Sequence, residues 1–338
     1  MSGKHIILVH GRDIKPSEAA VEKLARLAIS SGLRRAHKAD WAKKFDDGAV
    51  KLTLAYYGDL NNRILAENDK KTASKLLDSD PRHDNAPCFP ADVIEEAFRF
   101  TDSISEFDAA AYRKVLSDNT DFHLLDEAAD TVSMFGALLT GGLLNTTIIN
   151  MATSDMGAYL TSHSVGSAVR ARLDEPLRNA LSSDDDVCLL SHSMGCIVAY
   201  DLMWKYAHMM EYEQFRSQQR KVDLWLTIGN PLGETGVRRN LLDGRYPEVD
   251  KYPRNQVLRW VNIYAEDDYV AHIEKVAPLY KSSKSKDTGL QSISDTHIYN
   301  CWAYREVKSA RTISNPHDLY GYLMNQSVGA TLASWLEA

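Results

Sequence analysis

The 338-residue chain is 44% hydrophobic and 25% charged, a composition typical of a globular protein with a substantial core. Its length allows one large α/β domain, or a core domain with an inserted cap. The formal net charge of −7 argues against a nucleic-acid-binding protein, because such proteins normally carry a basic surface patch. We therefore expect a small-molecule ligand and no nucleic-acid partner.

The chain has four cysteines, and none of them has the CxxC or Cys/His spacing of a metal site. Cys188 and Cys196 lie in apolar segments, where we expect them to act as small hydrophobic residues. From Met1 the chain passes within a few residues into an apolar segment, which leaves no room for a signal peptide. The expectations are no metal and a cytoplasmic location.

The first elements in chain order form a βαβ unit. Residues 5–11 read as a short buried strand that ends in His-Gly, and residues 16–30 read as a helix that begins at a proline. Residues 50–57 form the next predicted strand, which Gly58 and Asp59 close. A unit of this kind favours a parallel sheet with crossover helices.

Regular patterning then breaks down over residues 60–154, where helical patches and loops alternate without a convincing strand. We interpret this part as a mainly helical cap, or lid, inserted over the sheet. Its last stretch, residues 131–154, contains no charged residue, and its length alone could suggest a membrane span. Three glycines and two asparagines make it a poor span, so a buried or lid helix is preferred. A plain core helix, an apolar lid over an acyl site and a transient membrane-surface contact remain open.

The alternation of strands and helices resumes after this insertion. Residues 155–181 form a predicted helix, residues 318–336 a closing helix, and strands are predicted over 187–190, 222–228, 257–265 and, less clearly, 297–304. The fold class expected for residues 1–59 and 155–338 is therefore α/β, with a doubly wound, mostly parallel sheet. Ligands bind such sheets at the carboxyl ends of the strands.

The most informative stretch is residues 187–200, with the sequence VCLLSHSMGCIVAY. An apolar strand stops at a sharp turn, a helix-compatible run follows, and Ser193 lies at the apex. The pattern is S-x-S-x-G, a variant of the G-x-S-x-G nucleophile elbow in which Ser191 takes the place of the first glycine. Small residues such as Ser191 and Gly195 are needed because the turn is strained and brings strand and helix together. The Met194 N–H would then be free to bind an oxyanion.

A nucleophilic serine needs a general base and an acid that orients it, and after an elbow the expected chain order is Ser, Asp or Glu, then His. Asp268, just after the strand at 257–265, is the preferred acid, and Asp267 is the second choice. The alternative is that both aspartates merely cap a turn. His317, directly before the closing helix, is the preferred base, and His297 is its rival.

The loop after the first strand is the expected source of a second oxyanion donor. Gly11 would let the backbone approach a substrate, and the N–H of Arg12 would join that of Met194. His10 is interpreted as a structural hydrogen-bonding residue.

These pieces together resemble the serine hydrolases of the α/β-hydrolase superfamily, of the lipase and esterase kind. The matching motifs are IILVHG, CLLSHSMGCIVAYD, LTIGNPLG, WVNIYAEDDYVA and NPHDLYGYL, and the run DMGAYL resembles the helix before the elbow. The resemblance covers residues 4–59 and 155–338 but not the insertion. The sequence departs from the family pattern at Ser191 and in the choice between Asp267 and Asp268.

The resemblance implies an α/β-hydrolase fold, hydrolysis of a carboxylic ester or related acyl bond through an acyl-enzyme, and no metal or organic cofactor. By motif position, Ser193 is the nucleophile, His317 the base and Asp268 the acid. Arg12 and Met194 are the oxyanion donors. The expected substrate is a small-molecule acyl ester or lipid-like compound. A thioesterase or amidase activity, and a non-catalytic scaffold that binds a ligand or partner, are the alternatives.

Overall fold

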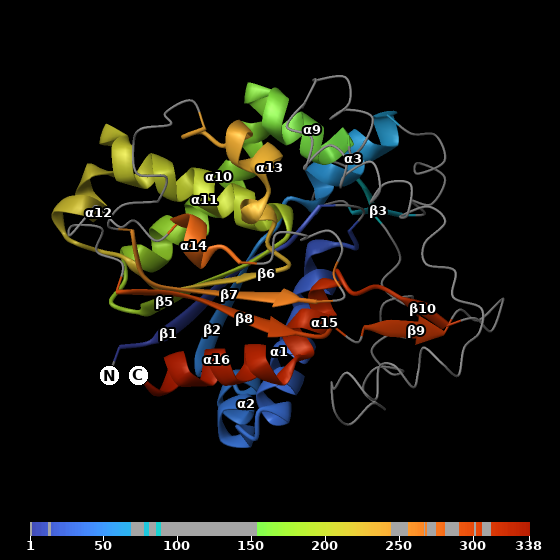
Figure 1. The fold of residues 1–338 in the computed structure, drawn as a ribbon, viewed down its shortest axis with the longest axis vertical. Coiled ribbons are helices and arrows are strands. Elements are labelled where there is room, and N and C mark those ends of the chain that lie inside the picture. Colours follow the sequence, from blue (N-terminus) through green and yellow to red (C-terminus); the bar gives the residue numbers. More distant parts are fainter. Residues whose placement is uncertain are drawn as a thin grey trace.

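A computed structural model describes residues 2–12, 15–68, 78–80, 86–88, 154–244, 256–266, 268, 275–280, 291–300, 302–305 and 312–338. At its centre is a six-stranded sheet in the order β2-β1-β5-β6-β7-β8, and every pair of neighbouring strands is parallel (Figure 1). The strands are β1 (Lys4–Val9), β2 (Val50–Ala55), β5 (Asp186–His192), β6 (Val222–Ile228), β7 (Val257–Ala265) and β8 (Ser292–Ile298). The predicted α/β class with a parallel sheet is confirmed.

Helices flank both faces of this sheet (Figure 1). On one face lie α1 (Glu18–Arg35), α2 (Ala39–Asp46), α15 (Leu319–Met324) and α16 (Gln326–Glu337). On the other lie α3 (Gly58–Asn68), α9 (Ser154–Thr161), α10 (His163–Leu181), α11 (Met194–His208), α12 (Glu213–Ser217), α13 (Thr235–Asn240) and α14 (Ala277–Tyr280), with the short 3₁₀ turns η2 (Met210–Tyr212) and η3 (Pro231–Gly233).

The two layers arise because successive side chains of a strand point to opposite faces. In β1, Ile6 and Leu8 belong to the core under α1 and α16, whereas Ile7 and Val9 belong to the core under α10 and α11. All four side chains are fully buried. A strand covered on both faces therefore reads as the continuous apolar run seen in the sequence.

Helices α1 and α16 cross with their backbones in close contact. A Cβ atom at Gly329 would lie 2.0 Å from the carbonyl oxygen of Gly32, so neither position has room for a side chain on this side. The contact fixes the C-terminal helix against the first helix. It also anchors α15, which precedes α16 and carries residues of the candidate site.

Three predicted elements differ from the structure. The helix expected over 155–181 is two helices, because Ser162 caps α10 through an N–H···O bond from Val165. The closing helix is likewise divided at Asn325, whose side chain accepts a hydrogen bond from the Ser327 N–H and caps α16. The last strand of the sheet is β8, which ends at Ile298 instead of beginning near His297.

The expected insertion at residues 60–154 lies mostly outside the described residues, and so does its uncharged stretch, residues 131–153. The expected boundary at residue 59 falls inside α3. Within the insertion, the structure shows a small antiparallel pair, β3 (Asp78–Asp80) and β4 (Ala86–Cys88), where the sequence predicts no strand. Three-residue strands are too short to show an apolar alternation. A second small pair, β9 (Ala303–Arg305) and β10 (Thr312–Ser314), precedes α15.

The strand order reverses between β1 and β5. From β1 the chain proceeds outward to β2, and it later returns to the other side of β1 as β5. In open parallel sheets, ligands bind at the carboxyl ends of the strands where such a reversal opens a crevice. Among the helices that the structure describes, none is long and apolar enough to cross a membrane.

Candidate functional site

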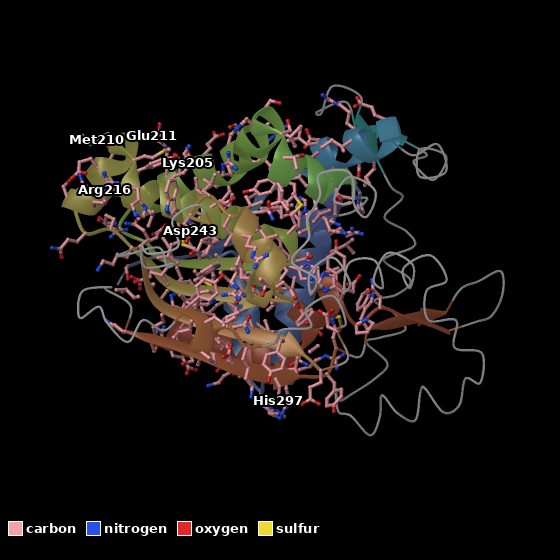
Figure 2. The ribbon with its side chains drawn as sticks, turned by 45° about the horizontal axis from the view of Figure 1, so that its top comes forward. Lys205, Met210, Glu211, Arg216, Asp243 and His297 are labelled. Carbon is pink, nitrogen blue, oxygen red and sulfur yellow. The ribbon has the colours of Figure 1, made fainter. Side chains whose placement is uncertain are left out.

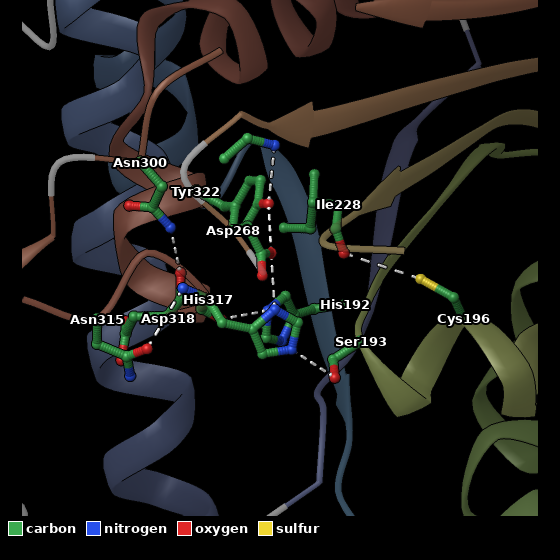
Figure 3. A network of polar contacts seen from close by, with 11 residues as sticks. His192, Ser193, Cys196, Ile228, Asp268, Asn300, Asn315, His317, Asp318 and Tyr322 are labelled. Atoms are coloured by element: carbon green, nitrogen blue, oxygen red, sulfur yellow. Dashed lines mark hydrogen bonds and ion pairs between the residues drawn. The ribbon is translucent and has the colours of Figure 1, made fainter. Parts of the chain in front are cut away.

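Ser193, His317 and Asp268 form a chain of hydrogen bonds at the carboxyl edge of the sheet (Figure 3). Ser193 Oγ lies 2.8 Å from His317 Nε2, and His317 Nδ1 lies 2.7 Å from Asp268 Oδ2. Because an ionised carboxylate only accepts, Nδ1 carries the hydrogen and Nε2 is left to accept the serine proton. The arrangement can move a proton from a hydroxyl to an imidazole while a carboxylate stabilises the imidazolium.

The turn that carries Ser193 joins β5 directly to α11 and has a strained backbone. Ser193 has φ of 53° and ψ of −126°, a combination that residues with a Cβ rarely adopt and that costs on the order of 1–3 kcal/mol. Its N–H donates to the Ile228 carbonyl at the end of the neighbouring strand β6, at 3.2 Å. Such strain persists only where the surroundings enforce it, and it is concentrated at functional sites.

Two glycines explain how closely the helix after Ser193 approaches the first strand. A Cβ atom at Gly195 would lie 2.5 Å from the His10 carbonyl oxygen, and one at Gly11 would lie 2.8 Å from Ser193 Cβ. Any larger residue at either position would push α11 or the loop after β1 away. Strand and helix do come close together at Gly195, whereas the expected approach of a substrate to Gly11 stays a prediction.

Ser191, which replaces the first glycine of the elbow pattern, has a defined place. It is fully buried at the end of β5, and its hydroxyl accepts a hydrogen bond from the indole nitrogen of Trp225 on β6, at 2.9 Å. A glycine would leave this buried indole N–H without that partner. Serine in place of glycine at this position thus satisfies a polar group in the core.

Arg12 and Met194, the residues expected to supply backbone donors, are each next in sequence to a residue at the centre of the site. Met194 begins α11, and the first N–H groups of a helix have no acceptor within it. Arg12 follows Gly11, which packs against Ser193. The His10 ring bonds the Gly11 carbonyl at 2.7 Å, and in a trans peptide this turns the N–H of Arg12 to the opposite side.

Contacts from α3 hold the same loop in place. The Lys15 N–H donates to the Asn62 side chain at 2.8 Å, and the Asn62 amide donates back to the Lys15 carbonyl at 2.7 Å. The ammonium group of Lys15 donates to the Arg12 carbonyl at 2.5 Å. Asn62 is fully buried, so α3 fixes the loop that follows β1.

His10 is a neutral residue with one tautomer. Its Nε2 accepts the Tyr57 N–H at 3.1 Å, so its Nδ1 carries the hydrogen that goes to the Gly11 carbonyl. Burial lowers the pKa of His10 to about 3, and the nearby Lys15 charge adds to the effect. The interpretation of His10 as a structural residue is consistent with these contacts.

His192, which precedes the serine, contacts both the backbone carbonyl and the ring of the base, His317. Its Nε2 lies 2.9 Å from the His317 carbonyl oxygen, and the two rings are 4.9 Å apart between centroids. Burial, followed by the proximity of His317, lowers the pKa of His192 well below its usual value. A neutral ring that donates from Nε2 leaves Nδ1 as an acceptor, and Nδ1 is buried without a partner among the described groups. The sequence pattern gave no reason to single out this histidine.

Two other residues of the site are not predicted by any sequence motif. Tyr322 on α15 places its hydroxyl 2.8 Å from Asp268 Oδ2. Gly229, directly after β6, has φ of 52°, and a Cβ there would lie 3.2 Å from His317 Cε1. Gly229 lies in the segment LTIGNPLG, but the sequence of a loop does not reveal which side chains from other elements will pack against it.

The alternatives to the acid and the base are resolved only in part. Asp267 lies outside the described residues, and Asp268 is the aspartate that contacts His317. His297 lies in β8 with its side chain 66% exposed, and its Nε2 lies 3.8 Å from Glu266 Oε1. Figure 2 shows His297 directed outward from the edge of the sheet. The structure therefore brings His317, and not His297, to Ser193.

Within the part of the chain that the structure describes, no group of three or more His, Cys, Asp or Glu side chains is arranged to hold a metal ion. Cys188 and Cys196 are buried, as expected for small hydrophobic residues. Comparison with protein-family models, with curated proteins and with solved structures gave no match to the chain.

Proposed function

We propose that the chain is a serine hydrolase with an α/β-hydrolase fold, which cleaves a carboxylic ester through an acyl-enzyme on Ser193. The observation that carries the proposal is the hydrogen-bonded chain from Ser193 through His317 to Asp268, with links of 2.8 and 2.7 Å. A strained serine between a buried strand and a helix supports it, because a nucleophile elbow has this backbone and, apart from Ser191, this pattern of residues.

In the first step, Ser193 Oγ attacks the ester carbonyl while His317 Nε2 takes its proton. The carbonyl oxygen becomes an oxyanion, and the N–H groups of Met194 and Arg12 stabilise it. Asp268, whose side chain is fully buried, stabilises the imidazolium that forms. The tetrahedral intermediate then collapses, and His317 gives its proton to the departing alcohol.

In the second step, water replaces the alcohol. His317 takes a proton from the water, the hydroxide attacks the acyl group on Ser193, and the same two N–H groups hold the second oxyanion. Collapse releases a carboxylic acid and returns the proton to Ser193. No step requires a metal or an organic cofactor.

The substrate is proposed to be a small acyl ester or lipid-like compound, with residues 60–154 forming a cap that shapes its pocket. Helix α3 contains the start of the insertion and α9 begins at its last residue, and the two helices pack against each other on the same side of the sheet (Figure 1). A segment that leaves and returns at one place is typical of an inserted cap. The uncharged stretch at 131–154 favours an apolar acyl group.

Hydrolysis of p-nitrophenyl esters tests the proposal. We expect the wild-type protein to turn over at least one ester of the series from acetate to palmitate. The Ser193→Ala variant should lose a factor on the order of 10⁴ to 10⁶ in kcat because the acyl-enzyme cannot form. His317→Ala should be similarly impaired, whereas His297→Ala, the matched control, should keep its activity.

Near wild-type turnover by a folded Ser193→Ala protein would contradict the mechanism. Loss of activity in His297→Ala together with its retention in His317→Ala would show that His297, and not His317, is the general base. A preference for acetate that falls steeply with chain length would remove the lipid-like substrate, and the absence of turnover with any acyl substrate would favour a non-catalytic scaffold.

A further inference from the structure

Tyr322 lies at the centre of the hydrogen bonds that hold the acid of the site. It belongs to α15, its side chain is fully buried, and its hydroxyl contacts both a backbone N–H and a carboxylate (Figure 3). The Ala265 N–H lies 3.0 Å from the hydroxyl oxygen, and Asp268 Oδ2 lies 2.8 Å from it. Tyr322 thus connects the last residue of β7 with the carboxylate three residues later.

The direction of these two bonds follows from what each group can do. A backbone N–H can only donate, so the Tyr322 oxygen accepts from Ala265. Its single proton is then left for Asp268, and an ionised carboxylate can only accept. The hydroxyl therefore donates to the carboxylate without any assumption about a histidine tautomer.

The bonds also clamp the turn that carries the acid. The Asp268 N–H donates to the Ala265 carbonyl at 3.0 Å, so the turn is closed once through its backbone. The Tyr322 hydroxyl closes it a second time, between the Ala265 N–H and the Asp268 carboxylate. As a result, Oδ2 is held at a fixed place relative to the end of β7.

The same oxygen atom serves both the tyrosine and the base. Asp268 Oδ2 accepts from His317 Nδ1 at 2.7 Å and from the Tyr322 hydroxyl at 2.8 Å. All three side chains meet over Gly229, where an added Cβ would lie 3.2 Å from Tyr322 Cε2 and 3.3 Å from Asp268 Oδ2. Two donors on one carboxylate oxygen share its negative charge. The hydrogen bond from the tyrosine therefore weakens the electrostatic attraction between the carboxylate and the histidine.

We propose that Tyr322 is a positioning residue of the site, which orients Asp268 toward His317 and, by sharing the carboxylate charge, sets the pH at which the base becomes protonated. The inference rests on the proposed serine hydrolase function. It adds a fourth residue, from a helix that contributes no reacting atom, to the nucleophile, base and acid.

Replacing Tyr322 by Phe removes the hydroxyl and leaves the ring. With one donor fewer on Oδ2, the Asp268 carboxylate interacts more strongly with His317, which stabilises the imidazolium. The acidic limb of the kcat/KM profile should move to higher pH by about 0.5 to 1 pH unit. At the plateau, kcat should fall by roughly 10-fold, because the carboxylate is less firmly oriented.

The other titratable groups near Asp268 and His317 are the same in the wild-type protein and in Tyr322→Phe. They are His192, which burial keeps neutral, Asp318, whose pKa desolvation raises to about 6, and Lys15, whose charge acts on both. Because each is present with and without the Tyr322 hydroxyl, the displacement of the limb between the two proteins isolates the tyrosine. Tyr280→Phe is the matched control, since it removes a buried tyrosine hydroxyl, bonded to the Leu232 carbonyl at 2.9 Å, from the other core.

A second variant keeps the ring, the hydroxyl and the fold. Incorporation of 3-fluorotyrosine at position 322 makes the hydroxyl a stronger donor, so the limb should move to lower pH, opposite to Tyr322→Phe. This substitution decides the question even where Tyr322→Phe fails to fold, because the Ala265 N–H keeps its acceptor. A purely structural tyrosine would give the wild-type limb in the fluorinated protein.

The His317 Nδ1 proton gives a readout that needs no substrate. Its NMR signal should move downfield in Tyr322→Phe, or upfield in the fluorinated protein, and remain in place in Tyr280→Phe. Wild-type protein that hydrolyses esters, with an unchanged limb and an unchanged signal in both Tyr322 variants, would overturn the inference and leave the proposed function intact. Wild-type protein with no hydrolase activity but with both NMR shifts would support the positioning role and count against the proposed function.

Discussion

Two buried histidines, His10 and His192, are each held in a single tautomer by backbone groups. His10 accepts from the Tyr57 N–H and donates to the Gly11 carbonyl, while His192 donates to the carbonyl of His317. Burial lowers the pKa of both below the usual value for histidine. They can therefore orient the loop after β1 and the backbone of the base without taking up the proton that the reaction moves.

Keeping His10 neutral links folding to pH. The unfolded chain binds a proton on this residue near pH 6.5, whereas the folded chain resists it down to a pKa of about 3. The stability that His10 contributes is therefore complete above pH 6.5 and is lost as the pH falls from 6.5 toward 3. We expect the difference in unfolding free energy between wild type and His10→Asn to narrow by about 1.4 kcal/mol for each pH unit below 6.5. Urea denaturation of both proteins at pH 7.5, 6 and 5 measures this difference in unfolding free energy. A difference that is constant with pH would contradict the conclusion that His10 stays neutral in the folded protein.

At this scale the sequence identifies the residues that belong to a recognisable motif and misses those that act through contact. Ser193, His317 and Asp268 were found from the elbow and from their places after strands or before a helix. Tyr322 was not, because its hydroxyl is indistinguishable in sequence from that of Tyr320 two residues earlier. Only the packing of α15 against the end of β7 selects one of the two.

At the scale of the elements, the site is a set of turns that follow successive parallel strands. Gly11 follows β1, Ser193 follows β5, Gly229 follows β6 and Asp268 follows β7. Parallel strands bring all these turns to one edge of the sheet, so residues far apart in the chain meet there. His317 reaches the same edge from the other direction, just before α15.

Gly229, in the turn after β6, leaves the space that the side chains of His317 and Asp268 occupy. It has φ of 52°, and an added Cβ would press on His317 and Asp268, with closest distances of 3.2 and 3.3 Å. Gly48 has φ of 78° with nothing within 4 Å of the corresponding position. Alanine at either position should cost roughly 1–2 kcal/mol in backbone strain. Gly229→Ala should in addition lower kcat/KM by roughly 10-fold or more by displacing the base, whereas Gly48→Ala should leave it unchanged.

Thermal unfolding and ester hydrolysis measured on both glycine variants separate the two effects. Equal loss of stability with activity lost only in Gly229→Ala is the expected pattern. Full activity in Gly229→Ala would mean that the turn after β6 does not hold the base in place.

The accuracy of the predicted elements follows from how each is bounded. Strands β6 and β7 match the predicted ranges 222–228 and 257–265 because both are apolar runs closed by polar or glycine-containing turns. The helix breaks at Ser162 and Asn325 were missed because helical spacing of apolar residues continues across them. Their side chains act as N-caps, and a cap inside a continuous apolar pattern is easily read as an exposed helical residue.

At the scale of the whole molecule, one parallel sheet separates two cores, and the site lies where the strand order reverses between β1 and β5. The α/β class was predictable because strands and helices alternate along residues 1–59 and 155–338. The pairing of β1 with both β2 and β5 could not be predicted from the sequence of any single segment, because it depends on how the helices pack on each face of the sheet. The roles proposed for the insertion stay predictions, because most of it lies outside the described residues.

The central claim is that His317 and Asp268 activate Ser193 as a nucleophile. A fluorophosphonate probe tests it most directly, because such a probe phosphonylates an activated serine whatever the natural substrate is. The probe should add once to the wild-type protein, and peptide mapping should place the adduct on Ser193. Ser193→Ala should stay unlabelled, and His317→Ala should react far more slowly. No adduct on the folded wild-type protein, or an adduct at another residue that persists in Ser193→Ala, would contradict the account.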